Sequence, residues 1–340
     1  MVGFGFGSLI EKLRNCPQTI VFPEGTDPRI LEASSRLLAS NFLTPILVGN
    51  PDEIHAKSEA AGFNIRGANI IDPENYDKID DMVAEFVRLR KGKGVTEDDA
   101  RKILKHSNYF GTMLVKMGLA DCLLGGATYS TADTVRPALQ LVKCKPNNSM
   151  VCSCFILVRP RATGENEVLA MGDCGIVISP TEDQLVEIAE ETVKCARIFG
   201  VDPKVAFLSF STNGSAQGED VDKMRNAARK TKERNPDLPV DGEMQFDAAV
   251  VPKVAEKKFP NSEVAGHANT FIFPDINAGN IGYKIAQRMG NFEAYGPILL
   301  GLNSPINDLS RGCTAAEVYS MAIITGAFSA TEKMAAAENK

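Results

Sequence analysis

Short apolar runs alternate with amphipathic helical stretches along the chain, and this alternation constrains the fold more than any other feature. Strands are predicted at residues 19–22, 45–49, 69–72, 121–126, 155–158, 175–178, 206–211, 270–274 and 297–302. Helices are predicted between them, as at 29–40. Two strands joined by a crossover helix run parallel. The sequence therefore predicts an α/β protein with mostly parallel sheets, whose ligands bind where the strands end.

One helix in the second half of the chain is signalled at both ends. Ser179 is the predicted N-cap, Pro180 suits the first helical position, and Glu182 fits a capping box. Gly200 indicates where the helix stops. We therefore predict a helix that begins at Pro180 and ends just before Gly200.

The length of 340 residues exceeds what one hydrophobic core usually organises, so two domains are expected. The polar stretch 143–149 is the predicted boundary. We predict a first domain of residues 1–146 plus 306–340 and a second domain of residues 147–305. The last helix would then pack on the first domain, and the loop before it would lie in an interdomain cleft.

Composition excludes several classes of function. The net charge of -6 and a pI near 5.3 argue against nucleic acid or an anionic membrane as the main partner. The eight cysteines include no CxxC pair, so neither a zinc site nor a disulfide framework is predicted. Residues 1–10 lack the basic start of a signal peptide, and no run of eighteen apolar residues is present. We expect a cytoplasmic protein with no metal site.

A polar loop at residues 307–314 is the strongest candidate for a binding site. It follows the apolar run at 297–302 and precedes an Ala- and Ile-rich helix predicted at 315–327. Backbone N–H groups at a helix N-terminus favour anions. The guanidinium of Arg311 can hold a phosphate through two hydrogen bonds. With Ser310 and Gly312 beside it, Arg311 predicts a phosphate site, although a structural turn fits the same residues.

Two neighbours of this loop have competing interpretations. Thr314 and Glu317 fit a capping box, which satisfies backbone N–H groups without any part in chemistry. Cys313 is a nucleophile that the helix dipole and Arg311 would activate, or a small buried side chain.

Other basic and hydroxyl side chains carry weaker signals. Arg90 lies in a basic helix end, where cations commonly face the negative end of the dipole. Ser130 or Thr131 begins a helix after two glycines and can be its N-cap, and Arg136 follows within the same helix. Each of these residues is therefore a candidate ligand contact with a structural alternative.

The remaining motifs argue against nucleotide and metal chemistry. Arg288 follows a Gly-rich loop at 277–282, which is not a GxGxxG fingerprint, and the chain has no Walker motif. His267 has no cysteine or carboxylate at ligand spacing. An anion site outside the nicotinamide and nucleoside-triphosphate classes remains.

Taken together, five segments resemble the phosphate acetyltransferases almost from end to end, in their short single-module form. They are VFPEG at 21–25, YSTADTVRPA at 129–138, DGEMQ at 241–245, NTFIFPDINAGN at 269–280 and PINDLSRG at 305–312. The resemblance implies two α/β/α three-layer domains with an interdomain cleft, usually in a homodimer. It also implies the reversible transfer of an acetyl group between coenzyme A and inorganic phosphate. Coenzyme A is then a substrate, and no tightly bound cofactor is expected.

The resemblance also assigns roles to residues. Ser310 and Arg311 match the serine and arginine at the phosphoryl and acetyl end of the site. Glu317 stands where the family has a catalytic aspartate, so this chain departs there by one methylene. The implied substrate-binding residues are Arg90, Ser130, Thr131, Arg136 and, towards coenzyme A, Arg288.

We expect Glu317 to take the proton of the coenzyme A thiol, so that the thiolate attacks acetyl phosphate directly in a ternary complex. Ser310 and Arg311 would stabilise the developing oxyanion and the departing phosphate. An acetyl-enzyme on Cys313 is the competing chemistry. A phosphate butyryltransferase, a decarboxylating dehydrogenase and a non-catalytic acyl-CoA-binding protein are the alternative functions.

Overall fold

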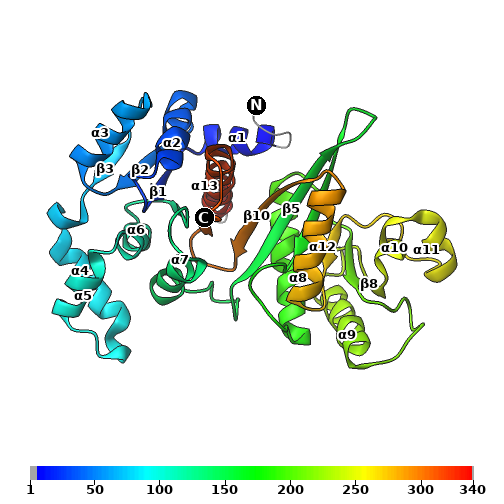
Figure 1. Ribbon diagram of the computed structural model, residues 1–340. Helices are drawn as coiled ribbons and strands as arrows, with labels where there is room; N and C mark the ends of the chain where they lie inside the picture. The colour runs from blue at the N-terminus through cyan, green and yellow to red at the C-terminus, as the bar shows by residue number, and fades with distance from the viewer. Residues whose placement is uncertain (1–5, 339–340) are drawn as a thin grey trace. The chain divides into compact units, whose positions relative to one another are not determined.

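The computed structural model describes residues 6–338, which form two compact units (Figure 1). One unit contains the chain up to Lys145 and again from Leu302 onward, and the other contains Pro146–Gly301. A β-sheet lies at the centre of each unit, with helices packed against it. The predicted α/β class with mostly parallel strand pairing is confirmed.

The sheet of the first unit is wholly parallel and has the order β11-β4-β1-β2-β3. Its strands are β1 (Gln18–Phe22), β2 (Leu43–Val48), β3 (Asn69–Ile71), β4 (Cys122–Gly125) and β11 (Ile306–Asp308). The first four agree with the predicted strands to within a few residues. The fifth forms where the chain returns from the second unit and pairs with β4.

Eight α-helices accompany this sheet among the described residues. They are α1 (Phe6–Asn15), α2 (Pro28–Ser40), α3 (Pro51–Ala61), α4 (Ile79–Arg90), α5 (Glu97–Leu104), α6 (Ser107–Lys116), α7 (Thr131–Pro137) and α13 (Ala315–Glu338). Short 3₁₀ turns at Pro73–Asn75 and Lys91–Lys93 follow β3 and α4, and a π-helical segment at Ala138–Val142 extends α7.

Helices cover both faces of the first sheet. Leu43 pairs with Gln18, so it shares a face with Ile20, while Val21 points to the other face. α13 packs against Leu43 at Gly326, and α6 packs against Val21. α13 also contacts α1 and α2, and most of its middle turns are buried. The last helix therefore packs in the core of the first unit.

The sheet of the second unit is mixed and has the order β10-β5-β6-β9-β7-β8. Its strands are β5 (Cys152–Pro160), β6 (Asn166–Gly172), β7 (Val205–Leu208), β8 (Val240–Met244), β9 (Thr270–Ile272) and β10 (Glu293–Leu300). β6, β9, β7 and β8 run parallel, whereas β5 and β10 are antiparallel to their neighbours. Five α-helices accompany it among residues 146–301: α8 (Glu182–Ile198), α9 (Glu219–Arg234), α10 (Phe246–Val250), α11 (Pro252–Lys258) and α12 (Ile276–Met289).

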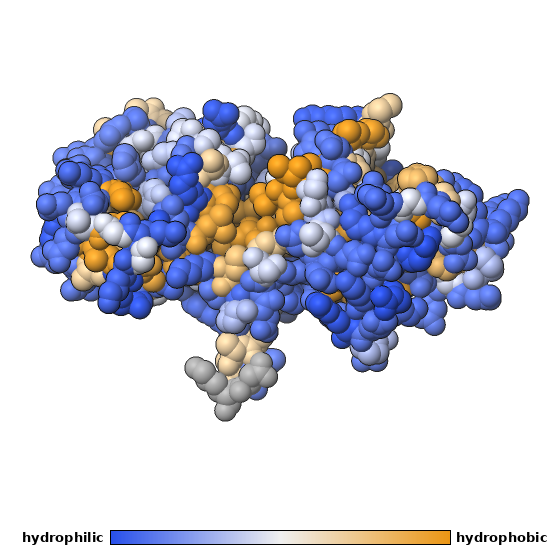
Figure 2. Space-filling view, turned by 90° about the horizontal axis from the view of Figure 1, so that it is seen from below, coloured by the Kyte–Doolittle hydropathy of each residue, from blue (hydrophilic) through white to orange (hydrophobic). Residues whose placement is uncertain are grey.

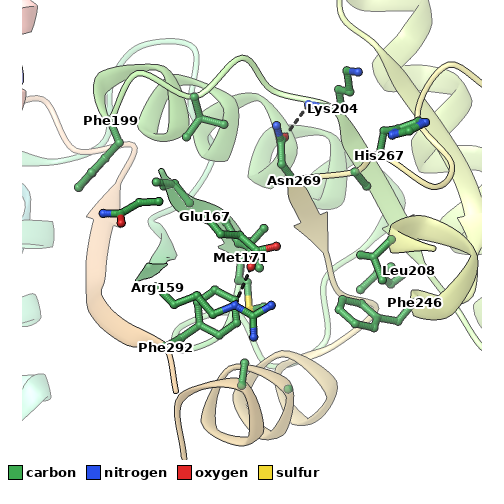
Figure 3. A pocket seen from close by; sticks show the side chains of 18 of the residues that line it. Arg159, Glu167, Met171, Phe199, Lys204, Leu208, Phe246, His267, Asn269 and Phe292 are labelled. Carbon is green, nitrogen blue, oxygen red and sulfur yellow. Dashed lines mark hydrogen bonds and ion pairs between the residues drawn. The ribbon is translucent and has the colours of Figure 1, made fainter. Parts of the chain in front are cut away.

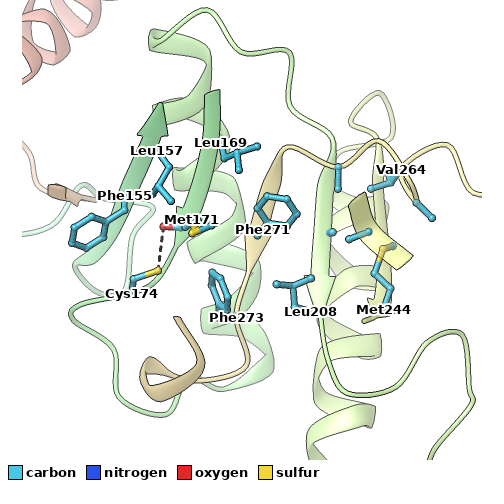
Figure 4. Close-up of a cluster of buried hydrophobic side chains, with 14 of the residues drawn as sticks. Phe155, Leu157, Leu169, Met171, Cys174, Leu208, Met244, Val264, Phe271 and Phe273 are labelled. Atoms are coloured by element: carbon cyan, nitrogen blue, oxygen red, sulfur yellow. Dashed lines mark hydrogen bonds between the residues drawn. The ribbon is translucent and has the colours of Figure 1, made fainter. Parts of the chain in front are cut away.

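A cluster of apolar side chains lies on one face of this second sheet (Figure 4). Phe155 and Leu157 of β5 and Leu169 and Met171 of β6 alternate with residues that point the other way. Gly172, one residue on, lies against Thr192 of α8. Successive residues of these strands thus point alternately towards α8 and towards this cluster.

Three predictions for individual elements are wrong. No strand forms at 175–178, because the buried carboxylate of Asp173 accepts hydrogen bonds from the N–H groups of residues 175–177 and folds them into a loop. The helix begins at Glu182 rather than Pro180, because Thr181 is the N-cap and forms a capping box with Gln184. The run at 297–302 does form a strand as far as Leu300, but this strand is β10 of the second unit, so the expectation that it leads into the loop at 307–314 is wrong, and β11 takes that place.

Candidate functional site

Three loops meet at one edge of the first sheet. β11, β4 and β1 are parallel neighbours, with Val21 beside Leu123 and Leu123 beside Ile306. The segments that follow them, residues 23–27, 126–130 and 309–314, therefore leave the sheet at its carboxyl edge. Ligands of parallel α/β sheets bind at this edge. The loops carry Ser130 and the predicted pair Ser310 and Arg311.

The buried carboxylate of Glu24 shapes the loop after β4. Its Oε2 accepts hydrogen bonds from the N–H groups of residues 126 and 127 at 3.0 and 3.2 Å. Its Oε1 accepts from the N–H groups of residues 128 and 129 at 2.5 and 3.0 Å, and from the hydroxyl of Thr128 at 3.0 Å. These backbone donors are therefore bonded to a side chain of the protein itself.

Arg29, in the first turn of α2, joins all three loops. Its guanidinium donates to Asp27 Oδ2 at 2.7 Å and to the carbonyl oxygen of Ala127 at 2.8 Å. It also donates to the carbonyl oxygens of Arg311 and Cys313 at 2.8 and 3.1 Å. Sequence reasoning missed this residue, because a single arginine at the start of a helix resembles a surface cation.

Asp27 completes this junction. Its side chain caps α2 by accepting from the N–H of Arg29 at 2.9 Å. Burial on its own raises the pKa of Asp27, but the hydrogen bonds and the charge of Arg29 outweigh it and lower the pKa below its usual value. Asp27 is therefore held as a carboxylate against the guanidinium of Arg29.

The loop after β11 exposes the side chains of Ser310 and Arg311. The hydroxyl of Ser310 accepts from the N–H of Gly312 at 3.2 Å. Within residues 6–338, the guanidinium of Arg311 makes no hydrogen bond or ion pair with another residue. Arg311 is thus an available planar donor, as the sequence predicts.

Glu317 occupies the capping-box position. Its Oε2 accepts from the N–H of Thr314 at 2.7 Å and from the Thr314 hydroxyl at 3.0 Å, and its own N–H donates back to that hydroxyl at 3.2 Å. The N–H of Cys313 is also bonded within the loop, to the carbonyl oxygen of Ser310. The expectation that free N–H groups of this loop face an anion is therefore wrong for Gly312, Cys313 and Thr314.

The thiol of Cys313 is buried rather than presented to solvent. Its Sγ lies 3.6 Å from a guanidinium nitrogen of Arg29. Burial raises the pKa of the Cys313 thiol, and the nearby Arg29 charge does not reverse this shift. The geometry therefore fits a small buried side chain better than an activated nucleophile.

α7 presents two predicted residues at its start. Ser130 is the N-cap and forms a capping box with Asp133. The Thr131 hydroxyl donates to Oδ2 of Asp308, the last residue of β11, at 2.6 Å. The structural role anticipated for Ser130 is present, whereas the bond from Thr131 to the neighbouring strand was not anticipated.

Arg90 and Arg136 come from different helices but lie near the same tyrosine. Arg90 ends α4, and Arg136 lies in the last turn of α7. Burial raises the pKa of Tyr109, and the charges of Arg136 and Arg90 both act to lower it. The hydroxyl of Tyr109 donates to Gln140 at 3.1 Å. The fold thus brings two of the predicted arginines into one neighbourhood of the first unit.

Arg288 lies in the second unit, exposed in the last turn of α12. It is near enough to Tyr283 to lower the pKa of that phenol, although burial has the larger effect and raises it. The ring of Tyr283 stacks on Phe155, with ring centroids 3.9 Å apart.

A cavity of about 1040 Å³ also lies in the second unit (Figure 3). Its lining includes apolar side chains such as Met171, Leu208 and Phe292, with Lys204 and His267 also contributing. Arg159, another lining residue, is ion-paired with Glu167. None of the predicted site residues lines this cavity, which is therefore distinct from the loops of the first sheet.

Within residues 6–338, no group of three or more His, Cys, Asp or Glu side chains is placed to hold a metal ion. No helix among these residues is long and apolar enough to cross a bilayer. The face of the molecule seen in Figure 2 is mainly hydrophilic, with some apolar patches.

Comparisons with known proteins agree with the resemblance. The sequence model described as phosphate acetyl/butaryl transferase matches residues 6–326. A phosphate acetyltransferase of Bacillus subtilis is 52% identical over 322 residues, covering 95% of this chain and 98% of that protein. One of Staphylococcus aureus is 46% identical, covering 94% and 97%.

Solved structures give the same result. A phosphotransacetylase from Streptococcus pyogenes superimposes with a TM-score of 0.91 at 52% identity, covering 96% of this chain and 98% of that one. The EutD phosphotransacetylase from Staphylococcus aureus gives 0.89 at 45% identity, covering 96% and 98%. The chain belongs to the phosphate acetyl/butaryl transferase family.

Proposed function

We propose that this protein is a phosphate acetyltransferase, which interconverts acetyl-CoA and phosphate with acetyl phosphate and coenzyme A. The observation that carries this proposal is the 52% identity, over 95% of the chain, to a protein named for that activity. The guanidinium of Arg311, which has no partner among the described residues and lies on a loop at the carboxyl edge of a parallel sheet, supports it.

In the proposed mechanism, Glu317 is the general base. A coenzyme A thiol has a pKa of about 8.5 by analogy with cysteine, so a base helps to form the thiolate at neutral pH. The two bonds from Thr314 both end on Oε2 of Glu317. Among the described residues Oε1 has no hydrogen-bond partner, so it is available to take the proton. The capping and catalytic interpretations of Glu317 are thus compatible.

The thiolate sulfur then attacks the acetyl carbonyl carbon of acetyl phosphate. A C–S bond forms, the C–O bond to the phosphoryl group breaks, and inorganic phosphate leaves with the electron pair. Arg311 would hold the phosphoryl oxygens through its planar donors, and the Ser310 hydroxyl would donate to the developing oxyanion. Both side chains are exposed on the loop that precedes α13, and Glu317 lies in the first turn of that helix.

The other predicted residues would bind the anionic groups of the substrates. Arg90 and Arg136 share a neighbourhood around Tyr109, which supports a common role in phosphate recognition. Ser130 and Thr131 would contribute from the start of α7, and Arg288 would contribute towards coenzyme A. A cytoplasmic homodimer with coenzyme A as substrate, and without a tightly bound cofactor, completes the proposal.

One rival mechanism and one rival substrate remain within the family. An acetyl-enzyme on Cys313 requires an accessible thiolate, and the burial that raises the pKa of this thiol argues against it. A butyryl donor differs from acetyl by two methylenes, and each methylene changes discrimination by about 1–3 kcal/mol in an apolar pocket. The relatives named for acetyl transfer favour the shorter chain.

The test is thioester formation, followed by ultraviolet absorbance, from coenzyme A with either acetyl phosphate or butyryl phosphate. We expect rapid turnover that prefers the acetyl donor and reverses when phosphate is added to acetyl-CoA. A preference for butyryl phosphate would assign the sister activity. No thioester from either donor would contradict the enzymatic function and leave an acyl-CoA-binding role.

A further inference from the structure

Asp308 is buried at the end of β11, two residues before Ser310. Its Oδ2 accepts from the Thr131 hydroxyl at 2.6 Å, whereas among the described residues its Oδ1 has no partner in good hydrogen-bond geometry. The Thr134 hydroxyl, which is also buried without a partner among these residues, lies near enough to lower the pKa of Asp308. A buried polar atom without a partner is uncommon and usually has a reason. The reaction proposed above gives Asp308 no part.

The surroundings of Asp308 leave it little freedom to move. A Cβ atom at Gly126 would lie 2.3 Å from Oδ1, and the φ of +101° at that glycine independently excludes a side chain. The N–H of Leu309, the next residue, donates to the carbonyl oxygen of Gly125 at 2.7 Å. Asp308 therefore packs directly on the backbone of the loop that Glu24 fixes.

The Thr131 bond links two segments that both carry predicted site residues. Thr131 is the first residue of α7, next to its N-cap Ser130. Asp308 ends β11 and is only two residues from Ser310. Because consecutive Cα atoms are held about 3.8 Å apart, a shift of the Asp308 backbone also moves Ser310. This hydrogen bond therefore joins the start of α7 to β11 through two side chains.

We propose that Asp308 is a positioning residue: through the Thr131 hydroxyl it sets the placement of the start of α7 relative to the loop that carries Ser310 and Arg311. This inference rests on the proposed function, because both segments are assigned to substrate binding or catalysis there. Burial and the nearby Glu24 charge raise the pKa of Asp308, although the hydroxyls of Thr131 and Thr134 act to lower it.

The test uses the full chain and three single variants at these two positions. Asp308→Ala and Thr131→Val each remove the bond and should lower kcat/KM about tenfold, the scale of one hydrogen bond to a carboxyl group. Asp308→Asn keeps an acceptor for the Thr131 hydroxyl, so its kcat/KM should stay within about threefold of wild type. Thr131→Val carries the test if Asp308→Ala does not fold.

The decisive measurement is the double variant. If Asp308 acts through Thr131, Asp308→Ala should have almost no further effect on kcat/KM in a Thr131→Val background. Fully additive losses would overturn the inference, because Asp308 would then act independently of Thr131. The melting temperatures do not decide the matter, since both a positioning and a purely structural role can lower them.

Thr128→Val is the matched control. Thr128 also donates its hydroxyl to a buried carboxylate, that of Glu24, but this carboxylate keeps its four backbone donors when the hydroxyl is removed. Its kcat/KM should remain within about twofold of wild type. A wild-type protein without thioester formation would contradict the proposed function, whereas an active protein indifferent to Thr131→Val would contradict only the role of Asp308.

Discussion

Glu317 binds Thr314 through one carboxylate oxygen only: Oε2 accepts both the Thr314 N–H at 2.7 Å and the Thr314 hydroxyl at 3.0 Å. A capping residue and a general base are usually alternative interpretations of the same side chain. Here the two oxygens divide the roles, because the cap orients the carboxylate and leaves its second oxygen available. This division makes the two roles separable by mutation.

Replacing Glu317 with Gln should lower kcat about 100-fold or more, with KM changed less than threefold. The amide oxygen can still accept the bonds from Thr314, but the side chain no longer accepts a proton. Initial rates of thioester formation at varied coenzyme A measure both constants. Thr314→Val is the control, since it removes the hydroxyl and keeps the base. A kcat near wild type for Glu317→Gln would leave this residue only its capping role.

Replacing Arg311 with Gln should lower kcat/KM about 100- to 1000-fold, because a donor aimed at developing charge is lost. Lys at this position should recover only part of the activity, since an ammonium lacks the planar fork. Arg88→Gln is the matched control: Arg88 is also exposed, but it is paired with Glu85. Equal losses at positions 88 and 311 would indicate a general charge effect rather than a specific contact.

Replacing Cys313 with Ala should retain more than about a third of wild-type kcat. The thiol is buried, its pKa is raised by burial, and a direct transfer needs no acetyl-enzyme. Steady-state kinetics and mass spectrometry of the protein mixed with acetyl phosphate check this prediction. A loss of two orders of magnitude, together with an acetyl adduct on the wild-type protein, would instead favour the covalent mechanism.

The charge of Asp27 should contribute to the free energy of unfolding near neutral pH and should lose this contribution in acid. Its pKa is lower in the folded protein than in the unfolded chain, so its contribution is complete above about pH 4–5 and is lost as the pH falls through the folded value. Asp27→Asn keeps an oxygen that can cap α2 but loses the charge that faces Arg29, so it should reduce the free energy of unfolding by about 1 kcal/mol near pH 7. Urea unfolding from pH 7 to pH 3 tests this: the gap between the two proteins should narrow. A constant gap would show that the charge of Asp27 is unimportant.

The sequence predicts the elements with the clearest patterns. Strands with long apolar runs, such as β1 and β2, were predicted to within a few residues, because their burial shows in the local apolar pattern. The start of the last helix was also predicted correctly, but the helix continues beyond the predicted end at residue 327 to Glu338. β6 was missed because its first half, from Asn166, is polar and partly exposed. β11 was missed because three residues are too few to show an alternating apolar pattern, and the strand is defined by its pairing with β4.

The candidate site shows the same limit. Ser310 and Arg311 could be proposed from sequence because they occupy one short motif between a strand and a helix. Glu24, Arg29 and Asp308 were not found as site-shaping residues, because their partners lie roughly 100 to 280 positions away in the sequence. A buried carboxylate gives no sign in sequence of which backbone groups it will bind.

The carboxylate of Glu24 acts as a built-in counter-anion, since it fills the donors of residues 126–129 before any substrate arrives. Asp173 and Glu243 do the same for loops of the second unit. A loop that already holds its anion does not have to become ordered around one, so little conformational entropy is lost there when a ligand binds. In the proposed site, recognition of phosphate would then fall to exposed side chains such as Arg311, and the frame would not have to be remade at each turnover.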